Sequence, residues 1–119
     1  MIAVLVALAG GLGAMTRFAL DSWLSRLWRV PVGTVVINVT GSLLLGMLTG
    51  WALRHPHGGE LLAILGTGFL GGYTTFSTAS VEAARLVRGG RGLAALVHAV
   101  LMALLGLGAA LLGMWLTGR

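Results

Sequence analysis

The sequence predicts an all-α membrane protein with four transmembrane helices, the third of them broken near its middle. Of its 119 residues, 57% are hydrophobic and only 9% are charged, and the mean hydropathy is +0.97. A chain this apolar is typical of a protein whose solvent is the lipid bilayer. Its uncharged runs are Met1 to Thr16, Val30 to Leu53, Leu61 to Val81 and Leu93 to Gly118. One crossing needs about 20 apolar residues of helix, so we expect four crossings.

Each predicted helix has a reason to begin or end where it does. We expect the helices over residues 2–22, 31–53, 60–88 and 92–117, in a single domain covering residues 1–119. The first continues past Arg17, whose side chain can reach the interface or pair with Asp21. Pro31 suits the first turn of the second helix, which needs no N–H there. Glu60 places a carboxylate at the N-terminus of the third.

Composition excludes several other classes of protein. A cleaved signal peptide is the alternative for the first segment, but no basic stretch precedes Ile2 and three further spans follow. The chain has no cysteine, which excludes disulfides and thiolate metal sites. All eight basic residues are arginines near predicted helix ends, so we expect membrane lipid rather than nucleic acid as a partner. No nucleophile with its base and no phosphate-binding loop is recognisable, so we predict that the chain is not an enzyme.

Small residues are abundant in the predicted helices. The chain has 20 glycines, and two pairs, Gly46 with Gly50 and Gly68 with Gly72, have the spacing of close helix contacts in membranes. These faces can pack within one subunit or between two. Because four short helices enclose little interior, we favour an oligomer.

The central feature is the segment Gly66 to Thr78, which falls near the middle of the third predicted helix. It has four glycines in seven residues, followed by four hydroxyl residues in five, so we expect a break between Gly71 and Thr75. Unwound backbone at that depth is tolerated where it is buried in protein or lines a cavity. Its carbonyls suit a small cation, and the N–H groups of the next half-helix suit an anion. A kinked helix, whose hydroxyls bond to carbonyls one turn back, is the alternative.

Other polar or aromatic side chains near this segment are candidates for a site. Asn38 and Thr40 lie in the middle of the second predicted helix, where an amide serves either a functional site or simple hydrogen bonding between helices. Phe76 follows the break. Its ring edge can face an anion without the trapping effect of a full charge, although ordinary packing is the plainer interpretation.

Three ionisable residues have modest interpretations. Arg17 is typical of an interfacial anchor. Glu82 has Arg85 and Arg88 nearby in the sequence, which indicates a structural ion pair. His98 can act as a titrating group, but without a suitably spaced second ligand for a metal we interpret it as a hydrogen-bonded residue at an interface.

Three motifs together resemble one family. They are Gly10 to Arg17 in the first helix, Pro31 to Ser42 in the second and Gly71 to Thr78 in the third, with Glu82 beyond it. In this order they resemble the CrcB/Fluc family of fluoride channels over nearly the whole chain. The resemblance implies an antiparallel dimer, one subunit inverted relative to the other, in the plasma or inner membrane. Such a dimer exports fluoride passively and so reduces fluoride toxicity in the cytoplasm.

The same resemblance implies particular roles for residues at the break. The backbone carbonyls of Gly71 and Thr74 would hold a structural Na⁺ at the dimer interface, which agrees with the preference of hard cations for oxygen. Hydroxyl and amide donors and ring edges would strip water from a small anion in a narrow bore. The residues expected to line or orient the fluoride pathways are Asn38, Thr75, Phe76 and Ser77.

The chain also departs from the family pattern. Ala79 stands where a second phenylalanine is usual, and His98, Met102 and Gly106 stand where the fourth helix usually has a tyrosine and hydroxyl residues. Leaving out Arg17, five arginines lie on the side of the two connections after the first and third helices and two on the side of the termini: Arg26, Arg29, Arg85, Arg88 and Arg91 against Arg54 and Arg119. The positive-inside rule then predicts both termini outside. We therefore hypothesise that the chain pairs with a homologous subunit of opposite orientation rather than with itself.

Two alternatives come from other classes. A small multidrug-type exporter, which exchanges protons for cationic drugs, is also an antiparallel four-helix protein, but it needs a carboxylate within the first helix, where this chain offers only Asp21 at the end. The second alternative is a structural partner subunit that does not conduct, which the departures in the lining favour.

Overall fold

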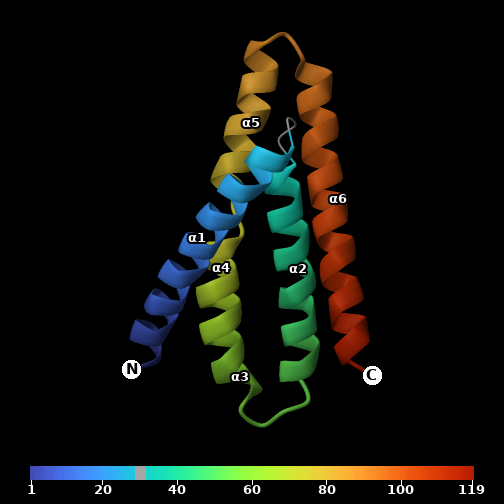
Figure 1. The fold of residues 1–119 in the computed structure, drawn as a ribbon. Helices are drawn as coiled ribbons and strands as arrows, with labels where there is room; N and C mark the ends of the chain where they lie inside the picture. Colours follow the sequence, from blue (N-terminus) through green and yellow to red (C-terminus); the bar gives the residue numbers. More distant parts are fainter. Residues whose placement is uncertain (29–31) are drawn as a thin grey trace.

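The structure is a computed structural model that describes residues 1–28 and 32–119 (Figure 1). The predicted start of the second helix at Pro31, and Arg29, lie outside the described residues. Every regular element in the described part is helical. The elements are α1 (Ile2–Leu27), α2 (Gly33–Ala52), α3 (Gly58–Leu61), η1 (Leu62–Leu70), α4 (Gly71–Tyr73), α5 (Phe76–Arg88) and α6 (Gly92–Thr117).

Three of these helices are long and apolar enough to cross a membrane without interruption, namely α1, α2 and α6. The segment between α2 and α6 is divided instead: η1 is a π-helix of nine residues, α4 has three residues and α5 has thirteen. Figure 1 shows this divided segment running from the turn after α2 to the turn before α6, with η1 and α4 beside α2 and α5 beside α6. Both termini lie at the end of the molecule where α2 ends.

The break lies inside the predicted range and is a true interruption rather than a kink. Thr74 (φ −76°, ψ 158°) and Thr75 (φ −143°, ψ 121°) are both extended. Thr75 then caps α5, because its side-chain oxygen accepts a hydrogen bond from the backbone N–H of Thr78. At the other end of α5, Gly90 has φ +74°, which allows the tight turn into α6.

Glycines bring the helices together in two pairs. A Cβ at Gly72 would overlap the Gly10 carbonyl, and one at Gly68 would come within 2.8 Å of the Val6 carbonyl, so α1 packs directly on η1 and α4. A Cβ at Gly46 would likewise overlap the backbone of α6 at Ala110. Close backbone approach of this kind is what small residues permit in membranes.

These contacts correct one expectation about the glycine faces. The pairs Gly46 with Gly50 and Gly68 with Gly72 were candidates for an interface between subunits, and all four contact other helices of the same chain. The physical reason is the close crossing of the helices. Helix α2 lies so near α6, and α1 so near the broken segment, that a side chain at these glycines would not fit. These four glycines therefore serve contacts between helices of one chain.

The first helix is longer than predicted and continues to Leu27. Within residues 1–28 and 32–119, Arg17 and Asp21 form no ion pair, so the pairing expected as one possibility is not made. Both residues line a small pocket of about 180 Å³ under α1, together with Thr34, Thr75 and Thr78.

Candidate functional site

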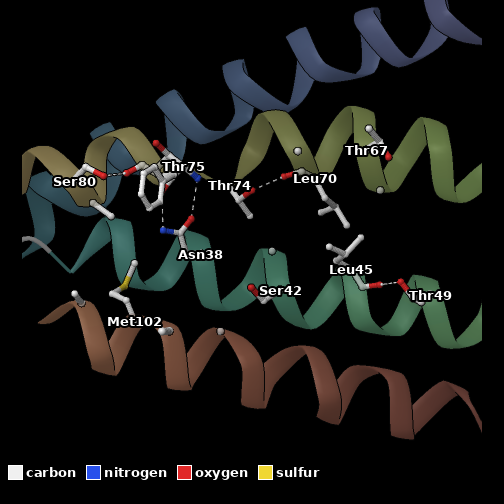
Figure 2. A pocket seen from close by; sticks show the side chains of 18 of the residues that line it. Asn38, Ser42, Leu45, Thr49, Thr67, Leu70, Thr74, Thr75, Ser80 and Met102 are labelled. Carbon is white, nitrogen blue, oxygen red and sulfur yellow. Dashed lines mark hydrogen bonds between the residues drawn. The ribbon is translucent and has the colours of Figure 1, made fainter. Parts of the chain in front are cut away.

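A groove of about 920 Å³ runs between the broken segment, α2 and α6 (Figure 2). The extended residues Thr74 and Thr75 open onto it, and α2 contributes Asn38 opposite them. The remaining lining is mostly apolar or small, which suits a surface that meets another apolar body. It includes Leu45, Leu62, Leu70, Ala79, Ala83, Ala99, Met102, Ala103 and Gly106.

Asn38 holds the break in place by pairing with the backbone of one extended residue. Its Nδ2 donates to the Thr75 carbonyl at 2.9 Å, and its Oδ1 accepts from the Thr75 N–H at 2.8 Å. Both backbone groups of Thr75 would otherwise lack a partner, because Thr75 is buried and lies outside any helix. Asn38 therefore fits both interpretations given from the sequence. It forms hydrogen bonds between two helices, and it also faces the groove.

Two backbone carbonyls at the break do not receive the hydrogen bond that a continuous helix would give them. The Thr75 N–H donates to Asn38 instead of to the carbonyl of Gly71, four residues earlier. The Thr78 N–H donates to the Thr75 hydroxyl instead of to the carbonyl of Thr74. Gly71 and Thr74 both line the groove. Backbone oxygens freed in this way are suitable ligands for a hard cation such as Na⁺.

The other predicted site residues at the break differ in position. Phe76, the first residue of α5, lines the groove and is 88% exposed. The Thr75 hydroxyl points back into the first turn of α5, where it lies 3.1 Å from the Ser77 hydroxyl and 3.2 Å from that of Thr78. Ser77 is exposed and is not part of the groove lining. The structure therefore brings Asn38, Thr75 and Phe76 together at the groove and leaves Ser77 beside it.

The departures from the family pattern also face the groove. Ala79 lines it from α5, and His98, Met102 and Gly106 line it from α6. Of these four, only His98 carries a polar side chain. The α6 wall is therefore short of hydroxyl groups, while the opposite wall contains Asn38, Ser42 and the broken segment.

Glu82 contacts partners other than those expected from the sequence. Its Oε1 accepts a hydrogen bond from the Thr34 hydroxyl at 2.7 Å, and its Oε2 lies 3.4 Å from Nε2 of His98. The expected ion pair with Arg85 or Arg88 is wrong for the described residues, because Glu82 faces inward while both arginines are exposed. His98 accordingly lies at a contact between α5 and α6 within one chain.

Sequence reasoning missed a polar row on α2. Thr34, Asn38 and Ser42 are spaced by four residues and so share one face of the helix. Thr34 binds Glu82, Asn38 binds Thr75, and Ser42 lines the groove. Thr40, the other polar residue considered, lies on a different face and contacts the Tyr73 hydroxyl at 2.9 Å. The signal was the four-residue spacing, which single-residue reasoning overlooked.

Fold and groove together define a small multi-pass membrane protein with polar, interrupted backbone beside an open groove. The chain matches the family described as CrcB-like protein, Camphor Resistance (CrcB), over residues 4–114. It is 54% identical over 120 residues to fluoride-specific ion channel FluC 1 of Leifsonia xyli, which covers 99% of this chain and 88% of the relative. It is 56% identical over 118 residues to fluoride-specific ion channel FluC 2 of Cutibacterium acnes, covering 96% and 95%. The chain belongs to the CrcB family.

Proposed function

We propose that this chain is a subunit of a passive, fluoride-selective channel that exports fluoride across the cell membrane and so lowers its toxicity in the cytoplasm. The observation that carries the proposal is the break fixed by Asn38, which places interrupted polar backbone on the lining of an open groove. Relatives named as fluoride-specific ion channels, covering nearly the whole chain, support fluoride as the ion. The exporter alternative is not favoured, because Asp21 lies in the small pocket under α1 instead of in the groove.

The proposed channel is an antiparallel dimer with four crossings in each subunit. The broken segment runs from one end of the molecule to the other and so supports a fourth crossing in pieces (Figure 1). An open groove of about 920 Å³ is far too wide to select a small anion. A second subunit that fills most of the groove would leave narrow pathways beside Asn38, Thr75 and Phe76, with Ser77 at their edge.

The same arrangement suggests a structural Na⁺ between the subunits. Each chain offers two released carbonyls, those of Gly71 and Thr74, whereas hard cations take about six oxygen ligands. Two chains in antiparallel orientation would supply four carbonyls around one ion. The bound ion would hold the two breaks together and keep the N-terminal end of α5 in place in each chain. A direct test is to replace Na⁺ by a bulky organic cation in detergent, which should cause loss of the dimer.

The partner that best fits this chain is a homologous subunit of opposite orientation. The α6 wall lacks hydroxyl groups at Met102 and Gly106, so a second chain that has them would complete at least one pathway. Several relatives have numbered names, FluC 1 or FluC 2, as expected where one organism has two such chains. The bias of the arginines toward one side of the membrane agrees with one fixed orientation.

The test is fluoride efflux from liposomes, followed with a fluoride electrode after addition of a potassium ionophore. The chain reconstituted with its homologue should release fluoride rapidly and retain chloride. The chain alone should release little. Rapid efflux from the single chain would exclude the heterodimer but leave the fluoride channel intact, whereas no efflux from either form would exclude the channel itself.

A further inference from the structure

Glu82 and His98 face each other across the contact between α5 and α6 with two hydrogen-bonding atoms that lack partners. Oε2 of Glu82 and Nε2 of His98 are buried, and neither makes a hydrogen bond to the described residues. They lie 3.4 Å apart. A carboxylate oxygen only accepts and an imidazole N–H donates, so a proton on Nε2 satisfies both atoms with a small closing movement.

The Thr34 hydroxyl makes this assignment specific. It donates to the other carboxylate oxygen, Oε1, at 2.7 Å. Glu82 therefore receives one hydrogen bond on Oε1 and has Oε2 directed at His98, where it can accept a second. With Nε2 protonated toward Glu82, the second ring nitrogen, Nδ1, is left as an acceptor in neutral His98 and as a donor only in the imidazolium.

Nδ1 is the atom of His98 that remains free to meet a ligand. It makes no hydrogen bond to residues 1–28 or 32–119, and unlike Nε2 it is not among the buried atoms without a partner. His98 itself lines the groove, on the wall that otherwise lacks polar groups. An anion beside Nδ1 would meet a lone pair when His98 is neutral and an N–H donor when it is protonated.

We propose that Glu82 and His98 form a proton-dependent anion site in the groove, at which fluoride binds together with a proton. The proton enters on Nδ1, and Glu82 balances the charge of the imidazolium, so that the anion is attracted without being trapped by an unpaired cation. This inference rests on the proposed function and adds a requirement to it: the channel takes up fluoride better as the pH falls.

Other charged groups near His98 do not provide the same response. The helix α2, which packs along α6, contains no titratable side chain. On α5 the other charges are Arg85 and Arg88, and Arg91 precedes α6; all three are exposed. Arg17 and Asp21 line the separate pocket under α1. Histidine is the side chain that changes charge between about pH 5 and pH 8.

The first experiment measures ionophore-dependent fluoride efflux between pH 8 and pH 6 in the dimer that conducts. Dependence on the ionophore separates fluoride carried by the channel from neutral hydrogen fluoride, which crosses lipid unaided. We expect efflux to rise about tenfold from pH 8 to pH 6, because imidazole takes up its proton in that range. His98→Gln keeps a donor but cannot be protonated, so its efflux should not change with pH.

His57→Gln is the matched control, since His57 lies in the exposed turn after α2, and it should keep the wild-type pH dependence. A pH-independent wild type, or His98→Gln with the wild-type dependence, would overturn the proton-dependent site while leaving the fluoride channel in place. Absence of efflux at every pH would overturn both.

A second measurement needs no variant in the test itself. Nuclear magnetic resonance of ¹⁵N-labelled histidine in lipid nanodiscs follows the protonation of each ring, with sodium fluoride compared against sodium gluconate at equal ionic strength. Because proton and anion binding are reciprocal, fluoride should move the titration midpoint of His98 to higher pH and leave that of His57 unchanged. An identical His98 titration in both salts would overturn the proposal.

Discussion

The two walls of the groove are built on different principles. On one side, Asn38 pairs with both backbone groups of Thr75, and the Thr74 hydroxyl bonds to the Leu70 carbonyl. On the other side, α6 presents one polar side chain, His98, among Met102, Gly106 and small apolar residues. The first wall, formed by Asn38, Thr74 and Thr75, fixes a backbone conformation that would be costly in lipid without its hydrogen-bond partners. The second wall, formed by α6, has no interrupted backbone to hold in place.

This difference shows which residues a membrane site cannot exchange. A side chain that satisfies buried backbone has no substitute, because leaving that backbone unpaired costs more than the pair contributes. A side chain that only faces a groove can be replaced, provided that another subunit supplies its chemistry. Three of the four residues that we expect to depart from the family pattern, His98, Met102 and Gly106, accordingly lie on the α6 wall.

The largest effect is expected from breaking the first wall. Asn38→Ala leaves the Thr75 N–H and carbonyl unpaired, at a cost of about 1–3 kcal/mol for each group. We expect at least about a 100-fold loss of fluoride efflux, which corresponds to roughly 3 kcal/mol. Liposome efflux measures the loss, and thermal unfolding in detergent measures the loss of stability.

Thr49→Val is the matched control for Asn38→Ala. Thr49 also lies on α2 and lines the groove, but its hydroxyl bonds to the Leu45 carbonyl of its own helix. We expect a change within about 0.5 kcal/mol in stability. An Asn38→Ala protein as active as Thr49→Val would contradict the role of the first wall.

Much of the first wall could be predicted from the sequence. Glycines and hydroxyl residues between Gly66 and Thr78 cannot sustain an ordinary helix, and the extended residues lie inside the predicted range. The pairing of Asn38 with Thr75 could not be predicted, since it joins residues 37 positions apart. Local preference locates a break, whereas the packing of α2 decides which side chain closes it.

The second wall and the helix faces were harder to predict. The pairs of small residues around Gly46 and Gly68 indicated close contact correctly, but the spacing alone contains no information on whether the contact lies within or between subunits. Glu82 was expected beside arginines because they are near in sequence. A buried carboxylate instead finds Thr34 and His98, which only the folding of α2 and α6 around α5 brings within reach.

The next effect tests the packing that supports the first wall. Gly72→Ala places a methyl group against the Gly10 carbonyl, so α1 must move away from α4. Overpacking of this kind costs about 1–3 kcal/mol, and we expect a lower unfolding temperature with reduced efflux. Gly11→Ala is the control, because a Cβ there meets nothing within 4 Å; equal loss in both variants would show that the Gly10 contact has no special role.

A smaller effect, of opposite sign, should come from repairing the second wall. Met102→Ser with Gly106→Ser restores two hydroxyls, and a Cβ at Gly106 meets only the Ser42 hydroxyl at 3.4 Å. If the missing donors limit the single chain, its efflux should rise about fivefold, the effect of about 1 kcal/mol of hydrogen bonding. Met114→Ser, on α6 but beside another pocket, should give no gain. No gain from the double variant would indicate that orientation rather than lining limits the single chain.

The smallest effect concerns a hydrogen bond behind the first wall. The Tyr73 hydroxyl lies 2.9 Å from that of Thr40, and Thr40 also donates to the Val36 carbonyl of its own helix at 2.7 Å. Tyr73→Phe therefore leaves Thr40 with a partner and removes one bond, at a cost of about 0.6 kcal/mol for a typical pair between membrane helices. We expect near wild-type efflux and a small decrease in unfolding temperature. A loss of efflux as large as that of Asn38→Ala would mean that the polar network extends past Thr75 to Tyr73, and that the first wall is one cooperative unit rather than a single pairing.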